Sequence, residues 1–406
     1  MAQSMVLGLD IGSWLIKAVV AEAAGDKLRL LAGFSRPSAG LRRGVVVEME
    51  EVVRNVNEIL SEVKTVSRAA VKNIYLNVGC SDTHTQVSRG IIAVARANSE
   101  IHEDDIERVI QASQAINLPQ NRMILHAITR EFIVDGVGDI KDPLGMLGSR
   151  LEVSSLVVDT FAPSVKNLMK CVELSGGSVS GLILNPLAAS RSTLSKNQKE
   201  LGVVLIDIGF NTTGMAVYEE DKLVHTAIFP VGAGHITNDL AIALKIPVEV
   251  AEKIKIGYGY ALAKDVPIKE NIDLKKIELN VSGSPSRRFV AEVVESRTEE
   301  ILDLVNNELK LAGKAGRLPA GAVLSGGGAK LPGIVDLCRQ QLKLSTQIGL
   351  VNAALFEART GDLAEYLESP EYAIPLGLIL WSRDLGKTKS VVKENFLTKI
   401  VKNLLP

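Results

Sequence analysis

The sequence contains few cysteines, few aromatic residues and little net charge, and each shortage narrows the possible functions. Among 406 residues there are three cysteines, Cys80, Cys171 and Cys338, which lie far apart and form no Cys-x-x-Cys pair. This usage is typical of reduced thiols in the cytosol and argues against disulfides or a zinc site. The net charge is −1 and aromatic residues make up 4% of the chain. Both values argue against a nucleic-acid partner, because such partners favour basic fields and stacking surfaces.

Membrane-directing segments of the usual kinds are also missing. The first residues, MAQSMVLGLD, lack a basic stretch followed by an apolar one, so we expect no secretory signal. No apolar run reaches the length of a membrane span, so we expect no transmembrane helix. At 406 residues the chain is too long for one compact core, and we expect at least two domains.

One hairpin pattern occurs twice in the chain. LGLDIGSWLIKAVVAEAAGDKLRL begins at Leu7, and VVLIDIGFNTTGMAVYEEDKLVH begins at Val203. In each, an apolar strand runs into Asp-Ile-Gly, a polar turn and a second apolar strand. We expect residues 5–35 to form a two-stranded hairpin and GDIKDPLGMLGSR, from Gly138, to form a loop. With the helical periodicity of segments such as EMEEVVRNVNEILSEVKTVSRA, the pattern predicts an α/β fold with an internal duplication.

The two bends have the chemistry of a phosphate site. Glycine has no Cβ, so the backbone can turn sharply and bring its N–H groups close to an oxyanion. Asp10 and Asp207 cannot sit directly against phosphate, and we expect them to hold a hydrated Mg²⁺. A single Asp-x-Gly is usually a plain turn, but a third element, LSGGGA at residues 324–329, also follows a strand and precedes a helix. If the bends at Asp10 and Asp207 face each other, they would hold a polyphosphate from both sides.

The paired hairpins and LSGGGAKLPGI resemble the actin-like ATPase superfamily. Within it the chain is similar to the FtsA family of bacterial cell-division actin homologues, through motifs that occur in family order over nearly the whole chain. These motifs are GLDIGSWLIKAVVAE, DGVGDIKDPLGMLGSRLEV, ILNPLAASRSTL, ELGVVLIDIGFNTTGMAVY, VGAGHITNDLAIAL, AEKIKIGYG, EVVESRTEEILDLV and PEYAIPLGLILW. The resemblance implies a duplicated actin-like (ribonuclease-H-like) two-lobe fold, with ATP and Mg²⁺ in the cleft.

The same resemblance implies a division of the chain into subdomains. An FtsA-type subdomain is inserted into the first lobe, and an amphipathic helix ends the chain. The predicted segments are 1–81 and 161–196 (first lobe), 82–160 (inserted subdomain), 197–231 and 301–385 (second lobe), 232–300 (outer subdomain), 386–393 (linker) and 394–406 (membrane-binding helix).

Site residues carry over from the family motifs position by position. Asp10 and Asp207 are the candidate metal ligands, and Glu252 with Lys255 of AEKIK would frame the adenosine, although two such residues could also be a solvated helix pair. The full candidate cofactor site is Asp10, Gly12, Ser13, Trp14, Lys17, Asp207, Gly209, Phe210, Asn211, Thr212, Thr213, Gly232, Gly234, Glu252, Lys255, Gly326, Gly327, Gly328 and Lys330.

The second bend departs from the usual family pattern DIGGGTTD. Phe210 and Asn211 replace two glycines, and Gly214 replaces an acid. We expect the Phe210 side chain to point away from phosphate, because it would otherwise crowd it. Trp14 stands where a small polar residue is usual, and Asn185 stands where many relatives have a glutamate that orients water. Asparagine cannot accept a proton, so with Asp207 and Asn185 as the candidate catalytic residues we expect at most a weak ATPase.

The last residues, ENFLTKIVKNLLP, have an amphipathic pattern. At 100° per residue, six apolar side chains fall on one half of a helix and two lysines fall opposite them. Such a helix could dock on the protein itself, but the polar linker and the lysines favour an interfacial anchor for anionic lipid. The predicted membrane residues are Phe396, Leu397, Ile400, Val401, Leu404, Leu405, Lys399 and Lys402.

The resemblance implies an ATP-binding cell-division protein that polymerises and tethers the FtsZ ring to the cytoplasmic face of the membrane. Expected partners are the FtsZ C-terminal peptide, further copies of the chain, anionic lipid and later division proteins. Two alternatives stay open: a PilM-like pilus-assembly adaptor, which the tail argues against, and a small-molecule kinase, for which no persuasive general base is visible.

Overall fold

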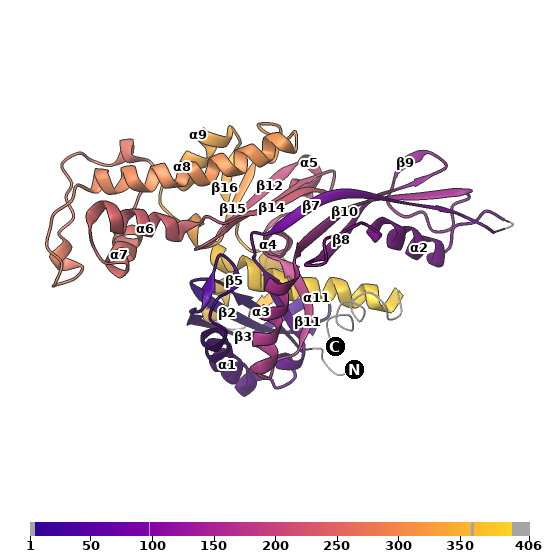
Figure 1. Ribbon diagram of the computed structural model, residues 1–406, viewed down its shortest axis with the longest axis horizontal. Helices are drawn as coiled ribbons and strands as arrows, with labels where there is room; N and C mark the ends of the chain where they lie inside the picture. Colours follow the sequence, from indigo (N-terminus) through magenta and orange to yellow (C-terminus); the bar gives the residue numbers. More distant parts are fainter. Residues whose placement is uncertain (1–4, 97, 359–360, 392–406) are drawn as a thin grey trace.

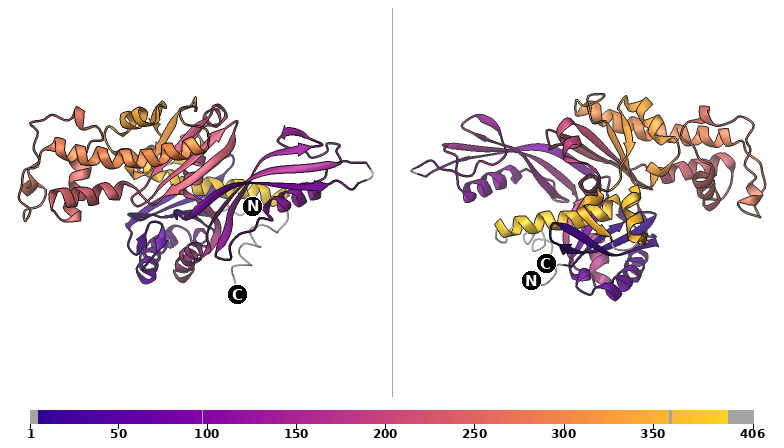
Figure 2. Two further views of the ribbon diagram at one scale, coloured as in Figure 1. Left: turned by 45° about the horizontal axis from the view of Figure 1, so that its top comes forward. Right: turned by 180° about the vertical axis from the view of Figure 1, so that it is seen from behind.

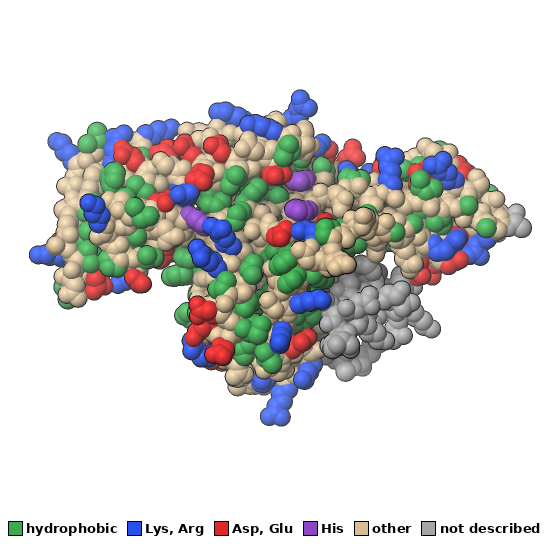
Figure 3. Space-filling view, viewed as in Figure 1, with side chains coloured by type: hydrophobic (Ala, Val, Ile, Leu, Met, Phe, Trp, Pro, Cys, Tyr) green, Lys and Arg blue, Asp and Glu red, His purple; other side chains and the backbone are tan. Residues whose placement is uncertain are grey.

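The computed structural model describes residues 5–96, 98–358 and 361–391. Two α/β lobes form the centre of the molecule, a helical arm extends from one end and a smaller sheet extends from the other (Figure 1). Views from other directions keep the arm and the small sheet at opposite ends (Figure 2). Acidic and basic side chains are interspersed over the face seen in Figure 3. Within the described part of the chain, no helix combines the length and apolarity that crossing a membrane requires.

The first lobe is built on a six-stranded mixed sheet in the order β11-β6-β1-β2-β3-β17. Strand β1 (Met5–Ile11) is buried along almost its whole length because helices pack on the sheet, which explains its nearly continuous apolar sequence. Helix α1 (Met49–Val66) contributes Val52, Val56 and Ile59 to the core beneath this sheet. The other strands and α-helices of this lobe are β2 (Leu15–Ala24), β3 (Lys27–Pro37), β4 (Leu41–Arg42), β5 (Val45–Val46), β6 (Ile74–Val78), α3 (Ala162–Leu174), β11 (Val179–Leu184), α4 (Asn185–Thr193), β17 (Phe356–Ala358), α10 (Gly361–Glu368) and α11 (Ala373–Val391).

The second lobe repeats the strand order and strand pairing of the first lobe. Its five strands lie in the order β14-β13-β12-β15-β16, and five strands of the first sheet, β3-β2-β1-β6-β11, follow the same plan. Strand β1 is antiparallel to β2 and parallel to β6, just as β12 is antiparallel to β13 and parallel to β15. The predicted duplication is therefore confirmed. The strands and α-helices are α5 (Lys196–Leu201), β12 (Val203–Ile208), β13 (Thr213–Glu219), β14 (Lys222–Phe229), β15 (Ala322–Ser325), α9 (Ile334–Leu342) and β16 (Thr346–Ile348).

The helical arm is formed by α6 (Ala233–Leu244), α7 (Val248–Tyr258) and the first half of α8 (Arg287–Leu311). Helix α8 joins two cores. Its buried side chains Val290 and Val294 pack with α6 and α7, and from Ile301 onward the buried side chains pack with the second lobe. The arm is thus held to the lobe by one continuous helix.

The inserted subdomain is a four-stranded sheet in the order β7-β10-β8-β9, with one helix packed on it. It contacts the second lobe at edge strand β14. The Thr85 hydroxyl donates to the Thr226 carbonyl at 2.7 Å, and the Lys222 amine lies 2.6 Å from the Asp139 carboxylate. Its elements are β7 (Thr83–Ala93), α2 (Glu103–Gln114), β8 (Arg122–Val134), β9 (Val137–Ile140) and β10 (Arg150–Phe161).

Two local predictions differ from the structure. Residues 5–35 form the first two strands and most of a third, β3, rather than a two-stranded hairpin. The loop predicted from Gly138 contains most of β9, which pairs with β8. The turn between them is Asp135-Gly136, and both residues have positive φ, 47° and 88°. Asp-Gly is a typical two-residue hairpin turn, so the sequence does contain a local signal for this hairpin.

The C-terminal part of the described chain also differs from prediction. We assigned residues 301–385 to the second lobe, but β17 pairs with β3, and Phe356 and Leu376 belong to the first-lobe core. Helix α11 lies so close to β1 that a Cβ on Gly8 would come within 2.3 Å of the Pro375 carbonyl oxygen. Apolar periodicity shows that a segment is buried, and it does not show against which lobe.

Helix α11 ends later than expected. It runs to Val391, through the first six positions of the predicted linker 386–393. The predicted membrane-binding helix, 394–406, lies outside the described residues.

Candidate functional site

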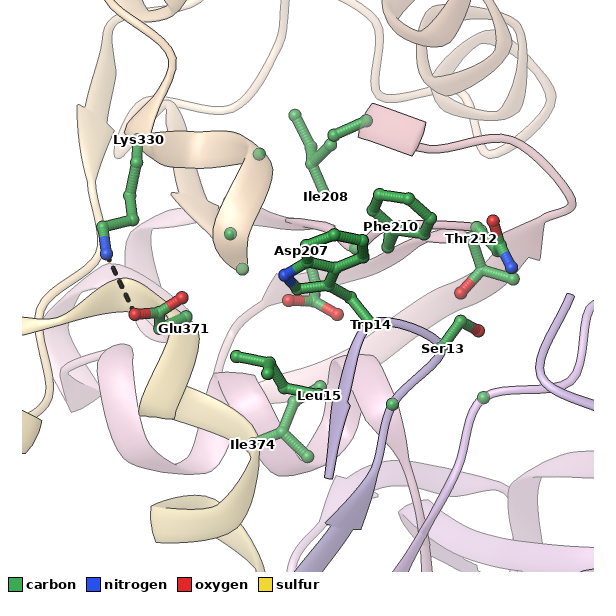
Figure 4. A pocket seen from close by; sticks show the side chains of 18 of the residues that line it. Ser13, Trp14, Leu15, Asp207, Ile208, Phe210, Thr212, Lys330, Glu371 and Ile374 are labelled. Atoms are coloured by element: carbon green, nitrogen blue, oxygen red, sulfur yellow. Dashed lines mark hydrogen bonds and ion pairs between the residues drawn. The ribbon is translucent and has the colours of Figure 1, made fainter. Parts of the chain in front are cut away.

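A cavity of about 340 Å³ lies between the two lobes, a volume within the range of small-molecule sites. It is lined from the first lobe by the bend at residues 12–14 and from the second by the bend at residues 209–212. The close view shows Ser13 and Trp14 on one bend and Phe210 and Thr212 on the other (Figure 4). The fold therefore brings the two copies of the hairpin to one cavity.

The two bends have the same backbone geometry. The Gly12 amide donates to the Leu15 carbonyl at 3.2 Å, and the Gly209 amide donates to the Thr212 carbonyl at 2.9 Å. A Cβ on either glycine would lie 2.7–2.8 Å from that same carbonyl oxygen, so no other residue fits without a shift of the backbone.

Backbone N–H groups at the tips of these bends are available to a ligand. Among the described residues, the backbone N–H groups of Ser13, Trp14, Phe210 and Asn211 donate to no backbone carbonyl. All four residues line the cavity. Free amides in a concave site are the usual donors to phosphate oxygens.

The two aspartates sit in different electrostatic surroundings. Asp10 is paired across the hairpin with Lys17, whose amine lies 3.0 Å from the carboxylate. Burial lowers the pKa of Lys17, but the charge and hydrogen bond of Asp10 outweigh it, so the pKa is raised overall. The lysine also donates to the Glu371 carbonyl at 2.6 Å.

Among the described residues Asp207 forms no such ion pair, although Lys17 lies near enough for its charge to lower the Asp207 pKa. The residue opposite it in the hairpin is Gly214, and its Oδ1 has no hydrogen-bond partner in the described structure. Burial raises the pKa of Asp207 to about 7, and the charge of Asp10 raises it as well. A buried carboxylate oxygen without a partner, near a second carboxylate, fits a hydrated Mg²⁺, which needs few protein ligands. Within the described ranges no group of three or more His, Cys, Asp or Glu forms a ready-made metal site.

The third glycine-rich element closes the cavity from the second lobe. After β15, Gly326 has φ 81°, and a Cβ there would lie 2.5 Å from the Ile208 carbonyl oxygen. A Cβ on Gly328 would come within 2.3 Å of the Ile208 side chain. The loop therefore packs directly on the second bend, and a salt bridge of 2.9 Å joins Lys330 to Glu371.

Glu252 and Lys255 form a buried pair at the arm side of the cavity. Their charged atoms are 2.7 Å apart, so the pair is not a solvated one. The Lys255 amine also donates to the Thr237 hydroxyl at 2.9 Å and the Ala233 carbonyl at 3.2 Å, while Thr237 donates to Glu252. Burial lowers the pKa of Lys255, and Glu252 opposes this. The network fixes α7 against α6 with both charged side chains lining the cavity.

Phe210 lines the cavity, and the prediction that its side chain points away from phosphate stays a prediction. Its ring lines the cavity and stacks on the indole of Trp14, with centroids 4.8 Å apart and planes inclined by 28°. Trp14 belongs to the first lobe and Phe210 to the second, so the rings meet across the cleft (Figure 4). Hairpin sequences alone do not show which side chains of two lobes will touch.

Asn185 is held by a second asparagine. The Ile11 amide donates to Asn77 Oδ1 at 2.8 Å, and Asn77 Nδ2 donates to Asn185 Oδ1 at 3.2 Å. Both amides line the cavity, and neither can act as a general base.

Most predicted site residues line the cavity, and three do not. Thr213 is buried behind the bend, where its hydroxyl donates to the Val231 carbonyl at 2.8 Å. Gly232 and Gly234 pack against the back of the second bend. Asn77 and Glu371 line the cavity and were missed. Glu371 lies in the motif PEYAIPLGLILW, whereas nothing local marks Asn77.

Two duplicated lobes with a cavity between paired hairpins define an actin-like fold. Solved structures with this architecture include a PilM–PilN type IV pilus biogenesis complex, with a TM-score of 0.66 and 17% identity, covering 92% of this chain and 97% of that one. Another is MreB5 of Spiroplasma citri bound to ADP, with a TM-score of 0.53 and 15% identity, covering 95% and 98%. At these identities the likeness shows the fold alone.

Sequence comparison identifies one family among the proteins with this actin-like fold. The family model described as "Cell division protein FtsA" matches residues 204–377, and "SHS2 domain inserted in FTSA" matches residues 81–159. A cell division protein FtsA of Pseudomonas aeruginosa is 34% identical over 93% of this chain and 89% of its own length. One of Borreliella burgdorferi is 32% identical over 97% and 94%. The chain belongs to the FtsA family of cell division proteins.

Proposed function

We propose that the chain binds ATP with Mg²⁺ in the cavity between its lobes. The observation that carries this proposal is the convergence of two glycine bends, each with free amides, on one cavity that also contains the unpartnered Asp207 oxygen. Amides 13–14 and 210–211 would hold phosphate oxygens, and Asp10 and Asp207 would hold the hydrated cation. An MreB5 with the same fold was solved with ADP, which supports a nucleotide as the ligand.

Hydrolysis in this site should be slow. Asn77 and Asn185 line the part of the cavity where a carboxylate would orient the attacking water and take its proton. An amide cannot accept a proton. The nucleotide would then act mainly by stabilising one arrangement of the lobes through binding. A steady-state turnover near one per second for the purified protein would contradict this part of the proposal.

The second part of the proposal is that the chain forms filaments and tethers the FtsZ ring to the cytoplasmic face of the membrane at the division site. Family membership supports this role. The outer subdomain, near residues 232–300, would receive the FtsZ C-terminal peptide, and the inserted subdomain would contact neighbouring copies and later division proteins. A tail of six apolar residues binds lipid weakly by itself, but many tails on one filament would bind by avidity.

The PilM-like alternative shares the fold, as the 17% identical PilM–PilN complex shows. The identity of 30% or more to division proteins over most of the chain favours the division role. A pull-down with the FtsZ C-terminal peptide and a PilN N-terminal peptide separates the two.

Electron microscopy on monolayers containing anionic lipid tests the whole proposal. We expect filaments on the lipid with ATP and Mg²⁺, and fewer or none without ATP. Neutral lipid is the matched control, on which filaments should be sparse. Filaments that form equally on neutral lipid would contradict the predicted binding of Lys399 and Lys402 to anionic lipid. The absence of any assembly with ATP would contradict polymerisation.

A further inference from the structure

The stack of Trp14 on Phe210, which we call the aromatic clasp, is a direct contact between the lobes at the cavity. The two rings come from the tips of the two bends and lie 4.8 Å apart between centroids. Trp14 is 49% exposed, so its ring lies at the edge of the cavity and not in its interior. The clasp therefore covers the cleft from outside at the two glycine bends, where the proposed function places the phosphates.

Phe210 is fixed from behind by the arm. Gly234, near the start of α6, leaves the space that the ring fills: a Cβ there would lie 2.8–2.9 Å from three ring atoms. The Lys255 amine lies 5.5 Å from the ring centroid, within range of a cation–π contact. In addition, the Gly234 amide donates to the Phe210 carbonyl at 2.7 Å. The ring is thus pre-positioned to receive the indole.

Opening the cleft must break the clasp. Aromatic pairs attract one another at centroid separations of about 4.5–7 Å, so a movement of a few ångströms between the bends ends the contact. A nucleoside triphosphate entering or leaving past the bends needs a wider passage than that.

We propose that the aromatic clasp is a gate that limits nucleotide exchange in this chain. This inference rests on the proposed function, since it concerns the same cavity. The clasp holds the cleft closed whether or not the cavity is filled, because neither ring needs a ligand to make the contact. A gate of this kind changes how fast a nucleotide enters and leaves, and it does not change how tightly the nucleotide is held.

The rate constants for a fluorescent ATP analogue test the gate. Stopped-flow mixing gives the association rate, and a chase with unlabelled ATP gives the dissociation rate. For Trp14→Ala and for Phe210→Ala we expect both rates to rise by a common factor of roughly 2 to 12, the range that corresponds to the loss of an aromatic stack. The Kd should stay within about twofold of the wild-type value.

Four further variants distinguish the loss of the aromatic clasp from a general disturbance of the fold. Trp14→Phe keeps a stack and should keep both rates within about twofold of wild type. Gly234→Ala adds a Cβ that displaces the Phe210 ring from its position against Trp14 without removing either ring, and it should raise both rates. Phe289→Ala removes an exposed aromatic side chain of α8 and should change neither rate. In the double variant Trp14→Ala/Phe210→Ala, the second substitution should add little, because its partner is already gone.

A readout without nucleotide checks the contact itself. In a Trp381→Phe background Trp14 is the remaining tryptophan of the two in the sequence, and Phe210→Ala should increase the quenching of its fluorescence by acrylamide. Unchanged quenching would overturn the clasp.

The kinetic outcomes are equally distinct. Unchanged rates in both alanine variants, with normal binding by the wild type, would overturn the gate and leave the proposed function standing. A faster association rate with an unchanged dissociation rate, and therefore a lower Kd, would show that the two rings occupy part of the nucleotide-binding site. This result would also overturn the gate. No binding of the analogue or of ATP by the wild type would refute the proposed function and the gate together.

Discussion

Replacing Asp207 with asparagine removes a buried charge for which the hairpin supplies no cation. Asp10 faces Lys17 across its hairpin, whereas Asp207 faces Gly214. Burial, and to a lesser degree the charge of Asp10, raises the pKa of Asp207 from 3.8 to about 7. Between these two pH values the folded protein holds a proton that the unfolded chain releases. The contribution of Asp207 to the stability of the wild type therefore falls as pH rises from about 4 to about 7, and it changes no further above that.

The size of the effect follows from the shift. A rise of about three pKa units corresponds to about 4 kcal/mol of unfolding free energy lost by the wild type at pH 8. Asparagine cannot ionise, so Asp207→Asn keeps this free energy. With about 2.1 cal/mol/K of unfolding entropy per residue, the variant should melt roughly 5 °C above the wild type at pH 8. At pH 4 the two should melt within about 1 °C of each other, because both side chains are then neutral.

Thermal unfolding of EDTA-treated, nucleotide-free protein at pH 4 and pH 8 measures this difference. Asp336→Asn is a matched control, since that carboxylate is exposed on α9, and it should shift the melting temperature by less than about 1 °C. Adding Mg²⁺ with ATP should narrow the gap, because a cation stabilises the ionised wild-type carboxylate. If the variant melts at or below the wild type at pH 8, or if the gap is the same at both pH values, the electrostatic argument is refuted.

Three other perturbations give independent tests. Burial lowers the pKa of His126 to about 4, so the contribution of this residue to folded stability is lost as pH falls below about 6.5; between pH 7 and pH 5, urea denaturation should show the wild type losing about 2 kcal/mol relative to His126→Gln, which keeps the opposing contribution of Asp207. Gly377→Ala should cost about 3 kcal/mol of unfolding free energy, because a Cβ there would lie 1.8 Å from the Ala188 carbonyl oxygen, whereas Gly257→Ala, with open space around it, should cost nothing. Phe396→Glu should release the protein from anionic liposomes in flotation assays without changing its melting temperature, and retention on the liposomes would contradict the anchor.

The fold class could be predicted from the sequence because its signals are local. A strand that is buried on both faces reads as an apolar run, and a bend that needs glycine shows Asp-Ile-Gly twice. These local rules gave the duplication and the three glycine elements, and the resemblance to the FtsA motifs gave half of the residues that line the cavity. The same motifs placed Thr213, Gly232 and Gly234 near the second bend, although these residues support the bend from behind and do not line the cavity.

Other features depend on how distant segments pack. Asn77 has no local mark, and it enters the site because β6 lies beside β1 in the first sheet. The return of residues 356–384 to the first lobe follows from the edge of β3 and the close contact of α11 with β1. Apolar periodicity is the same whichever sheet covers a segment, so no pattern in these residues could show the choice.

The sequence by itself determined two copies of one hairpin, the positions where only glycine allows the bend, and the family to which the chain belongs. Only the tertiary structure decided that Trp14 and Phe210 meet across the cleft and that helix α11 packs on the first lobe. The reason is physical: backbone conformation and burial are set by neighbours along the chain, whereas a contact between lobes depends on the relative placement of elements some 200 residues apart.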